Sequence, residues 1–354
     1  MLALIGACKA EPHRRDAAAA VPPSAPPSST AARVAQVRDA SVEQAADPAN
    51  RITLSIARAK PAGSGLARHC TLSGDPIAND CKRQGGSLTL DREGRLYVVA
   101  GSEVRRYRRA AAPAGDDARE CRFEAAGPAV ALPVEPVRAQ RIDGPVYMRS
   151  GGADWQLATV GDAVFAFDFL AGLYRIDRGK SEPLCVDVFG YGSIAALGGK
   201  LVIGRHGLER LALGRPCRAS SANIDDQGRG AVHVIRDHVY TTEITSIARY
   251  AGKTRIPLAE GTRLCGIVAL EPCGEGVCAF DNNCMQVIQL GADDKVVRSI
   301  PGDRLFDARP YSLRSAATER DGGIVLLTTQ RDVVGGTEVC EAAIYELPAA
   351  LFGL

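Results

Sequence analysis

The stretch LTLDREGRLYVVAGSEVRRYRR (88–109) contains three short segments in which apolar and polar residues alternate. The turn Asp91–Gly94 separates the first segment from the second, and Gly101–Ser102 separates the second from the third. Alternation of this kind between turn residues predicts three antiparallel strands, that is, a β-meander. A single meander cannot bury its own apolar face. The stretch must therefore pack against further strands.

The same order of strand, turn, strand and strand recurs five more times along the chain. One apolar residue aligns in the second strand of each unit: Leu96, Val164, Leu201, Val239, Val277 and Ile324. The successive spacings are 68, 37, 38, 38 and 47 residues. A period of about 40 residues is typical of the blades of a β-propeller, in which each small sheet is stable only between two neighbours. We expect an all-β fold, a propeller of six four-stranded blades over residues 51–348.

The first and last units of this ring leave two points open. The 68-residue spacing allows a seven-bladed ring as an alternative, with a degenerate blade near residues 136–152. The segment RITLSIARA (51–59) alternates aliphatic and polar residues. We expect it to join the sheet formed by residues 313–348 and close the ring, because an open ring would expose a sheet edge. Residues 349–354 are expected to form a C-terminal tail.

Short motifs add a resemblance to a known class of propeller. The turn DREG (91–94) precedes an apolar strand, and YRID (174–177) ends one unit. With these repeats, residues 51–348 resemble the six- and seven-bladed propellers that include the NHL and SMP-30-like proteins. The resemblance implies a rigid ring with its site in the channel or on one face. The metal-binding Glu, Asn and Asp set of SMP-30-like lactonases cannot be placed on this sequence residue by residue.

The N-terminus carries a lipoprotein signature. Residues 1–8 are apolar up to Cys8, and IGAC (5–8) resembles the bacterial lipobox, whose cysteine is acylated. A basic region and a full apolar region are missing, so we expect the true start to lie upstream; a chance apolar terminus is the alternative. Residues 9–50, rich in Ala, Pro and Ser, predict a disordered tether. Lys9 in place of an Asp predicts anchoring in the outer membrane, facing the periplasm or the cell surface.

The cysteine count supports export. Removing Cys8 from the eleven cysteines leaves ten, an even number that suggests up to five disulfides. Cys273 and Cys278 flank a Gly-Glu-Gly turn and are expected to bridge a hairpin, and Cys70 and Cys81 are expected to close a loop. A zinc site at the CGEGVCAFDNNC segment (273–284) lacks the usual paired spacing and a nearby His. We therefore assign no metal site.

Candidate chemistry in the channel rests on few residues. His233 lies in the first strand of its unit, where propeller enzymes place channel residues, and Asp168 or Glu243 are candidates to complete a catalytic set. The competing interpretation is a hydrogen-bonded structural His. Calcium is a further option at residues 281–283 and 293–294, whose Asp and Asn oxygens suit that ion. Asp and Asn are also ordinary turn residues, and we expect no cofactor.

Composition excludes several functions. The 354-residue chain has a formal net charge of +2 and 24% charged residues, which argues against a nucleic-acid partner. The arginines of VRRYRR (104–109) are expected to lie on a solvated strand. No apolar run reaches the roughly 18 residues of a membrane span.

We expect a lipid-anchored extracytoplasmic scaffold that binds a protein, peptide or glycan on one propeller face. The alternative is a metal-dependent hydrolase or lyase with its site in the channel. The sequence indicates no oligomeric state.

Overall fold

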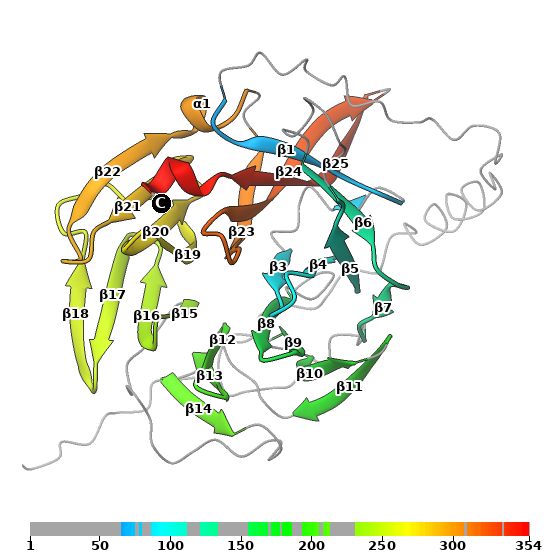
Figure 1. The fold of residues 1–354 in the computed structure, drawn as a ribbon, viewed down its shortest axis with the longest axis horizontal. Helices are drawn as coiled ribbons and strands as arrows, with labels where there is room; N and C mark the ends of the chain where they lie inside the picture. The colour runs from blue at the N-terminus through cyan, green and yellow to red at the C-terminus, as the bar shows by residue number, and fades with distance from the viewer. Residues whose placement is uncertain are drawn as a thin grey trace, which may run out of the picture. The chain divides into compact units, whose positions relative to one another are not determined.

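The described part of the chain folds mainly into β-strands, as a computed structural model shows (Figure 1). The structure describes residues 65–74, 78–79, 86–111, 121–133, 155–168, 171–177, 179–185, 193–204, 208–212, 231–307, 310–334 and 336–353. Within these residues the helical elements are α1 (Gly302–Leu305) and the 3-10 helix η2 (Ala349–Phe352). Neither has the length or apolar character that a bilayer span requires. The lipobox, the tether and the segment 51–59 lie outside the described residues.

The first three blades follow one another along the chain. Blade 1 contains β3 (Ser87–Leu90), β4 (Leu96–Ala100), β5 (Glu103–Arg109) and β6 (Cys121–Ala125), with the short β7 (Val130–Ala131) paired to β5. Blade 2 contains β8 (Gln156–Val160), β9 (Ala163–Asp168), β10 (Gly172–Asp177) and β11 (Lys180–Cys185). In blade 3 the described strands are β12 (Ile194–Leu197), β13 (Lys200–Gly204) and β14 (Leu208–Ala212).

The remaining blades repeat the same up-and-down order. Blade 4 contains β15 (Ala231–Ile235), β16 (His238–Glu243), β17 (Ser246–Ala251) and β18 (Thr254–Leu258). Blade 5 contains β19 (Ile267–Cys273), β20 (Gly276–Asp281), β21 (Gln286–Leu290) and β22 (Val296–Pro301). Blade 6 contains β23 (Ser312–Thr318), β24 (Ile324–Val334), β25 (Thr337–Leu347) and, from the N-terminal side, β1 (Arg68–Leu72); β2 (Ala78–Asn79) also pairs with β25.

The innermost strands close a ring of six blades. They contact one another in the order β3, β8, β12, β15, β19 and β23, and β23 contacts β3 again. Between blades 1 and 2 the backbone N–H of Leu157 donates to Ser87 Oγ at 3.1 Å. Because β3 and β8 touch directly, no seventh blade fits between them. The six-bladed prediction is confirmed, and the extra length of the 68-residue spacing falls in residues 110–120, within blade 1, and 132–155, between blades 1 and 2.

Packing between blades follows the physical expectation that each sheet is apolar on both faces. All six aligned second-strand residues, from Leu96 to Ile324, are buried. The described core divides into hydrophobic clusters that each lie between two neighbouring blades. Val202, Val232 and Val239, for example, pack together between blades 3 and 4. Burial between sheets, rather than one central core, therefore stabilises the fold.

Tight turns join the first two strands of the blades. In blade 3 the turn residues Gly198 and Gly199 both have positive φ, 51° and 75°. Blade 4 places Arg236 and Asp237 in the same region, with φ of 49° and 65°. Positive φ at both central positions matches the right-handed twist of the flanking strands, and glycine adopts it without strain. These turns keep one end of each blade compact.

Ring closure uses an N-terminal strand, but not the one expected from the sequence. β1 pairs antiparallel with β25, with His69 opposite Tyr345, and parallel with β6, with Cys70 opposite Cys121. The edge of β25 that the segment 51–59 was expected to cover is occupied by β1. The sequence favoured 51–59 because its apolar alternation is stronger than that of β1, in which Cys70 is the one fully buried residue.

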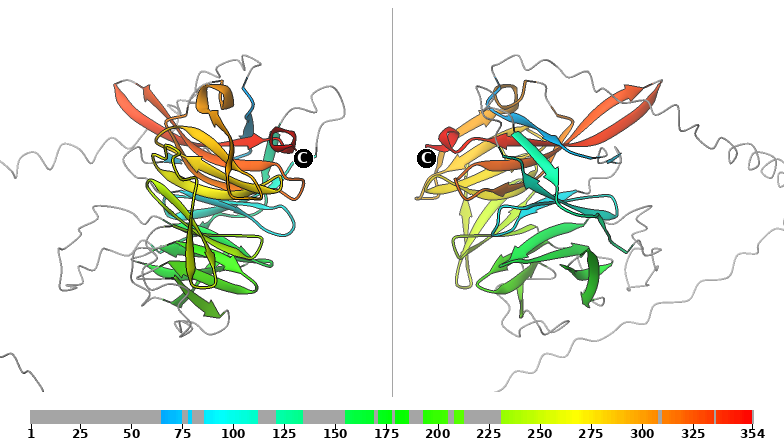
Figure 2. Two further views of the ribbon diagram at one scale, coloured as in Figure 1. Left: turned by 90° about the vertical axis from the view of Figure 1, so that its left-hand side faces the viewer. Right: turned by 45° about the vertical axis from the view of Figure 1, so that its right-hand side comes forward.

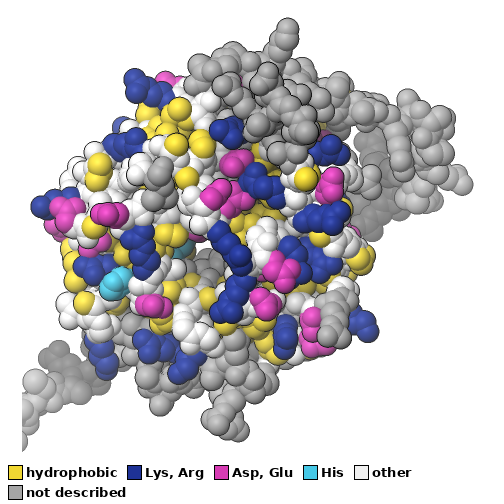
Figure 3. Space-filling view, viewed as in Figure 1, with side chains coloured by type: hydrophobic (Ala, Val, Ile, Leu, Met, Phe, Trp, Pro, Cys, Tyr) yellow, Lys and Arg dark blue, Asp and Glu magenta, His cyan; other side chains and the backbone are white. Residues whose placement is uncertain are grey.

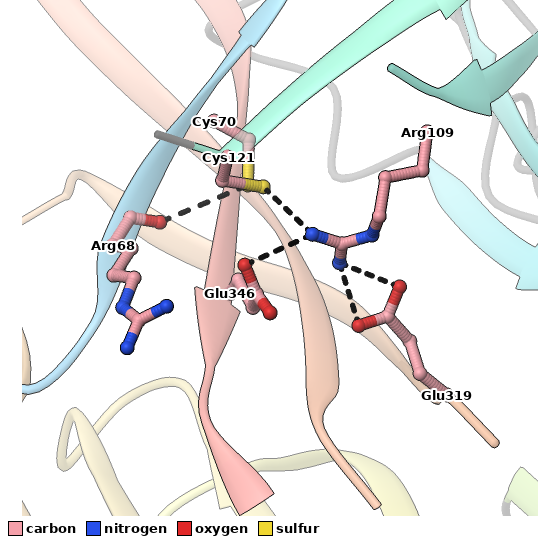
Figure 4. Close-up of a disulfide and its surroundings, with 6 residues drawn as sticks. All are labelled: Arg68, Cys70, Arg109, Cys121, Glu319 and Glu346. Atoms are coloured by element: carbon pink, nitrogen blue, oxygen red, sulfur yellow. Dashed lines mark hydrogen bonds and ion pairs between the residues drawn. A yellow bond between two sulfur atoms is a disulfide. The ribbon is translucent and has the colours of Figure 1, made fainter. Parts of the chain in front are cut away.

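The joint between the last and first blades is held by more than backbone pairing (Figure 4). A disulfide links Cys70 to Cys121 across the parallel pair β1–β6. The guanidinium of Arg109, on β5, donates to both carboxylate oxygens of Glu319 at 2.6 Å and to Glu346 at 3.3 Å. Arg109 thereby connects blade 1 to two positions of blade 6, beside the buried disulfide.

The other two disulfides seen among the described residues both lie in blade 5. Cys273 and Cys278 are bonded across the β19–β20 hairpin, as the sequence predicted, and Cys265 is bonded to Cys284. The predicted Cys70–Cys81 pairing is wrong because the partner of Cys70 is Cys121. Cys81 lies outside the described residues. Spacing along the chain favours near neighbours, whereas β1 meets β6 only through ring closure.

The expected C-terminal tail is part of the propeller. Residues 349–352 form η2, and Phe352 is buried in the cluster between blades 5 and 6. Gln289 Nε2 donates to the Phe352 carbonyl at 3.5 Å, and Arg298 donates to the Leu351 carbonyl. The described fold therefore extends to residue 353.

We predict that the ring-closing disulfide stabilises the fold more than the hairpin disulfide. Cys70 and Cys121 are 51 residues apart, whereas Cys273 and Cys278 are 5 apart. In the chain-entropy model these loops correspond to about 4 and about 2 kcal/mol of unfolding free energy. Urea unfolding of the double alanine variants of each pair, compared with the parent, measures both losses. Equal losses would contradict the closure role of Cys70–Cys121.

Candidate functional site

His233 lies on the innermost strand of blade 4, as predicted, but it serves the packing of two blades. Its Nδ1 accepts the backbone N–H of Leu270, on the innermost strand of blade 5, at 3.4 Å. The neutral ring then carries its proton on Nε2, which lies 3.2 Å from Thr242 Oγ1. Burial lowers the pKa of His233 to about 4. Both ring nitrogens are used within the protein, which favours the structural interpretation.

The two carboxylates proposed to accompany His233 are not brought to it. Thr242 lies on the face of β16 that His233 contacts, so Glu243, the next residue, faces the opposite way. Glu243 accepts a hydrogen bond from Ser246 at 3.1 Å within its own turn. Asp168 ends β9 in blade 2 and accepts the N–H of Ala171 at 2.8 Å. The predicted channel set is not assembled by these contacts.

Asp168 has a counterpart in blade 5 that explains its burial. The strand AVFAFD (163–168) matches GVCAFD (276–281), and both terminal Asp side chains are buried. Asp281 accepts the N–H of Cys284 at 3.2 Å, the same three-residue step that joins Asp168 to Ala171, and also the N–H of Cys265 at 2.9 Å. These carboxylates therefore organise the turn between the second and third strands of their blades.

The calcium option at residues 281–283 and 293–294 stays an expectation without a supporting contact. Asn282 Oδ1 accepts the N–H of Leu313 at 2.7 Å, which ties this turn to blade 6. Asp293 accepts the N–H of Lys295, and Asp294 forms an ion pair with Arg249 at 2.7 Å. Each of these oxygens bonds to the protein itself. This pattern is that of ordinary turn chemistry.

Two clusters in the described part of the chain bring three potential metal ligands together. One consists of Cys70, Cys121 and Glu346, and the other of Cys265, Asp281 and Cys284. In both clusters the two sulfurs are joined as a disulfide. A metal binds thiolates, not a disulfide. Neither cluster fits a metal ion in this state of the protein.

Sequence reasoning missed the most perturbed carboxyl group. Glu271, on the innermost strand of blade 5, accepts the backbone N–H and the hydroxyl of Thr318 in blade 6, both at 3.0 Å. Burial raises its pKa to about 8. The available signal was a lone acidic residue in the apolar strand IVALEPC (267–273). Glu271 extends the pattern of side chains that hydrogen-bond to the neighbouring inner strand.

The β24–β25 hairpin is the feature that distinguishes blade 6. Each of its strands has 11 residues, and it projects beyond the other blades (Figure 2). Pairing with β23 ends at Thr329, whose carbonyl accepts the N–H of Tyr311 at 2.8 Å. We call residues 330–334 and 336–339, beyond this last bond, the arm. The available sequence signal was the pair Gly335–Gly336, which follows eleven residues, 324–334, without Gly or Pro.

The arm carries exposed side chains of the kind that dominate protein interfaces. Val333 is 62% exposed and Tyr311, at the base of the arm, is 48% exposed. The Arg331 guanidinium lies 5.1 Å from the centroid of the Tyr311 ring and forms an ion pair with Glu338. An aromatic ring, an arginine and an aliphatic residue in one exposed group are typical of a binding hot spot. This group is the candidate site.

Among the described residues on the face seen in Figure 1, charge does not single out another site. Figure 3 shows Lys and Arg interspersed with Asp and Glu over the face seen in Figure 1. The basic strand β5 is engaged internally rather than simply solvated. Its arginines contact acceptors of this chain: Arg105 with Glu103, Arg106 with the Ala126 carbonyl, Arg108 with Glu124, and Arg109 with Glu319 and Glu346.

Comparison with known proteins finds distant similarities among solved structures and no family. No protein-family model and no curated protein matches the chain. Among solved structures it is similar to a Thermus thermophilus protein assigned as an oxidoreductase (glucose dehydrogenase), at 11% identity and a TM-score of 0.46, covering 78% of this chain and 99% of that one. It is also similar to regucalcin, a calcium-binding protein of Agrobacterium tumefaciens, at 12% identity and a TM-score of 0.43, covering 79% of this chain and 97% of that one. The similarity to BamB of Moraxella catarrhalis has 11% identity and a TM-score of 0.33, and covers 73% of this chain and 81% of that one.

We predict that Glu271 makes the protein less stable as the pH rises. Its folded pKa of about 8 exceeds its ordinary value of 4.5, so between these values the folded state holds a proton that the unfolded state has lost. Stability then falls by up to about 1 kcal/mol per pH unit. The melting temperature of Glu271→Gln relative to the parent is expected to rise between pH 5 and 8.

The variant His233→Gln is the matched control for this titration. The folded pKa of His233, about 4, lies below its ordinary 6.5. The parent therefore loses stability as the pH falls from about 6.5 to 4, and the control should gain relative to the parent only on that acid side. If the difference in melting temperature between Glu271→Gln and the parent did not change with pH, the result would contradict a buried, protonated carboxyl group at Glu271.

Proposed function

We propose that the chain is an exported, lipid-anchored propeller that binds a partner protein through the arm. The observation that carries this proposal is the exposed group of Tyr311, Arg331 and Val333 on a hairpin that projects from a rigid ring. Exposed aliphatic and aromatic side chains gain free energy when a partner covers them. A rigid support limits the entropy lost on binding.

Topology places the arm on the face with the longer connections. In an up-and-down blade, the second strand ends at the same side where the first strand begins. The arm, which follows the second strand of blade 6, therefore shares a face with the described connection between blades 4 and 5, residues 259–266. Turns on the other face are as short as two residues, as at Gly198–Gly199. Recognition residues concentrate on long loops held by a rigid scaffold.

A protein fits the arm better than a glycan does. Glycan binding usually uses the open face of an aromatic ring, whereas Arg331 covers one face of the Tyr311 ring. Val333 offers aliphatic surface without a hydrogen-bonding group. Arg331 keeps a side-chain exposure of 45% despite its ion pair with Glu338, so it remains accessible to a partner.

Export and anchoring rest on different observations. Disulfides persist in oxidising compartments, and seven cysteines of the described residues are disulfide-bonded. Together with the lipobox at Cys8 and the Ala-, Pro- and Ser-rich segment 9–50, this supports a lipoprotein of the outer membrane that faces the periplasm or the cell surface.

We predict that Cys8→Ser, expressed from the authentic start, moves the protein from the membrane fraction to the soluble extracytoplasmic fraction. The acyl chains attached to this thiol would supply the membrane affinity. Fractionation and immunoblotting measure the distribution, with Ser28→Ala in the segment 9–50, which keeps the Cys8 thiol, as the control variant. Unchanged membrane association would contradict the anchor.

We predict that the arm retains specific proteins from a detergent extract of membranes of the producing cells. The triple variant Tyr311→Ser, Arg331→Ser, Val333→Ser should lose them, because it removes the exposed group without touching the core. The control is Val296→Ser, Val297→Ser, which removes comparable exposed side chains from β22 in blade 5. Quantitative mass spectrometry compares the three baits. Identical protein sets on all three would overturn the proposal.

A further inference from the structure

We propose that the partner is bound as an added β-strand along the outer edge of β24 at residues 330–334, an inference that rests on the proposed protein-binding function. β24 lies between β23 and β25, but β23 pairs with it only as far as Thr329. The pairing with β25 continues to Val334, opposite Thr337. Among the described strands, none covers the other edge of residues 330–334.

The register fixes which backbone groups this edge offers. In an antiparallel pair, successive residues direct their N–H and C=O alternately to one side and the other. Thr329 directs its carbonyl toward β23, where it accepts the Tyr311 N–H. The pairing with β25 has no irregularity through the arm. Arg331 and Val333 therefore direct their N–H and C=O groups away from β25, toward the open edge.

One of these groups already has a hydrogen-bond partner within the arm. The N–H of Val333 donates to the side-chain carboxylate of Asp332 at 2.7 Å. Asp332 is exposed, so this bond forms at the surface of the arm. A carbonyl of an incoming strand would replace the carboxylate at the same N–H. Main-chain pairing of this kind supplies affinity, and side chains beside the edge supply specificity.

The charges select a different protein over a second copy of this chain. Pairing both outward residues of two copies places Arg331 opposite Val333 of the second copy, and the two Asp332 side chains then face each other. Like charges directly opposite destabilise a strand pair. A complementary antiparallel strand carries, in chain order, an aliphatic residue opposite Val333, a basic residue opposite Asp332 and an acidic residue opposite Arg331.

Two synthetic peptides of one composition test this directly on the full chain. The peptide acetyl-STVKETS-amide has the complementary order, and acetyl-STVEKTS-amide exchanges the two charges. We expect the first to bind at least tenfold more tightly and to slow hydrogen exchange of the Arg331 amide. The Asp332 amide, which faces β25, should be unchanged. Equal affinities, no binding at millimolar peptide, or protection elsewhere would overturn strand addition.

A matched pair of variants separates the backbone from the side chain. Val333→Pro removes the outward N–H without removing a bond to β25, since proline is tolerated at a free edge. Val333→Thr keeps the N–H. We expect Val333→Pro to weaken peptide binding at least tenfold and Val333→Thr less than threefold, with equal melting temperatures. Equal binding of the two variants would overturn the proposal.

The same variants distinguish this inference from the proposed function. One outcome is that the parent retains certain extract proteins, the triple serine variant loses them and Val333→Pro still retains them. This outcome would overturn strand addition but leave the protein-binding function intact. Strand addition is supported if Val333→Pro loses these extract proteins and Val333→Thr retains them. Protein sets that do not differ between the parent and the triple variant would instead overturn the proposed function.

Discussion

The insertion of β1 between β25 and β6 is the constraint on which the rest of the structure depends. Each blade is stable only because both of its faces are covered, so an unjoined first and last blade would leave a face and an edge open. β1 completes blade 6 and simultaneously pairs with the outer strand of blade 1. The sheets of the two blades thereby become one continuous sheet, whose end strands β23 and β3 also touch.

The repeat could be predicted from sequence because it is local. Val164, Leu201, Val239 and Val277 recur at nearly constant spacing, since each blade presents the same buried position to its neighbours. The Cys273–Cys278 bridge was predictable for the same reason, because a tight turn brings its ends together. The closing strand and the Cys70–Cys121 bond are contacts between distant parts of the chain. Their signals depend on how the ring closes, which spacing alone does not encode.

At the candidate site, too, local features could be predicted from the sequence and contacts between distant parts of the chain could not. The position of His233 on an inner strand was correct, but its partners lie in the next blade, and only the register shows that Glu243 faces the other way. The length of the β24–β25 hairpin was not predicted, although the run of residues 324–334 contains no Gly or Pro. That β23 stops short of it, leaving one edge open, follows from pairing that no alternation pattern reveals.

The covalent bond at the closing strand also determines how the protein responds to tension. A pull on the chain ahead of residue 68 acts along β1, whose five residues would otherwise slide out by breaking backbone bonds to two neighbours. Cys70–Cys121 passes that load to β6 at the third residue of β1, so the force bypasses Thr71 and Leu72 and enters blade 1 through a covalent bond that does not yield at forces that shear hydrogen bonds. A pull from the N-terminal side would thus leave β1 attached to blade 1, and the backbone pairing of β1 with β25 would carry the load between blades 1 and 6.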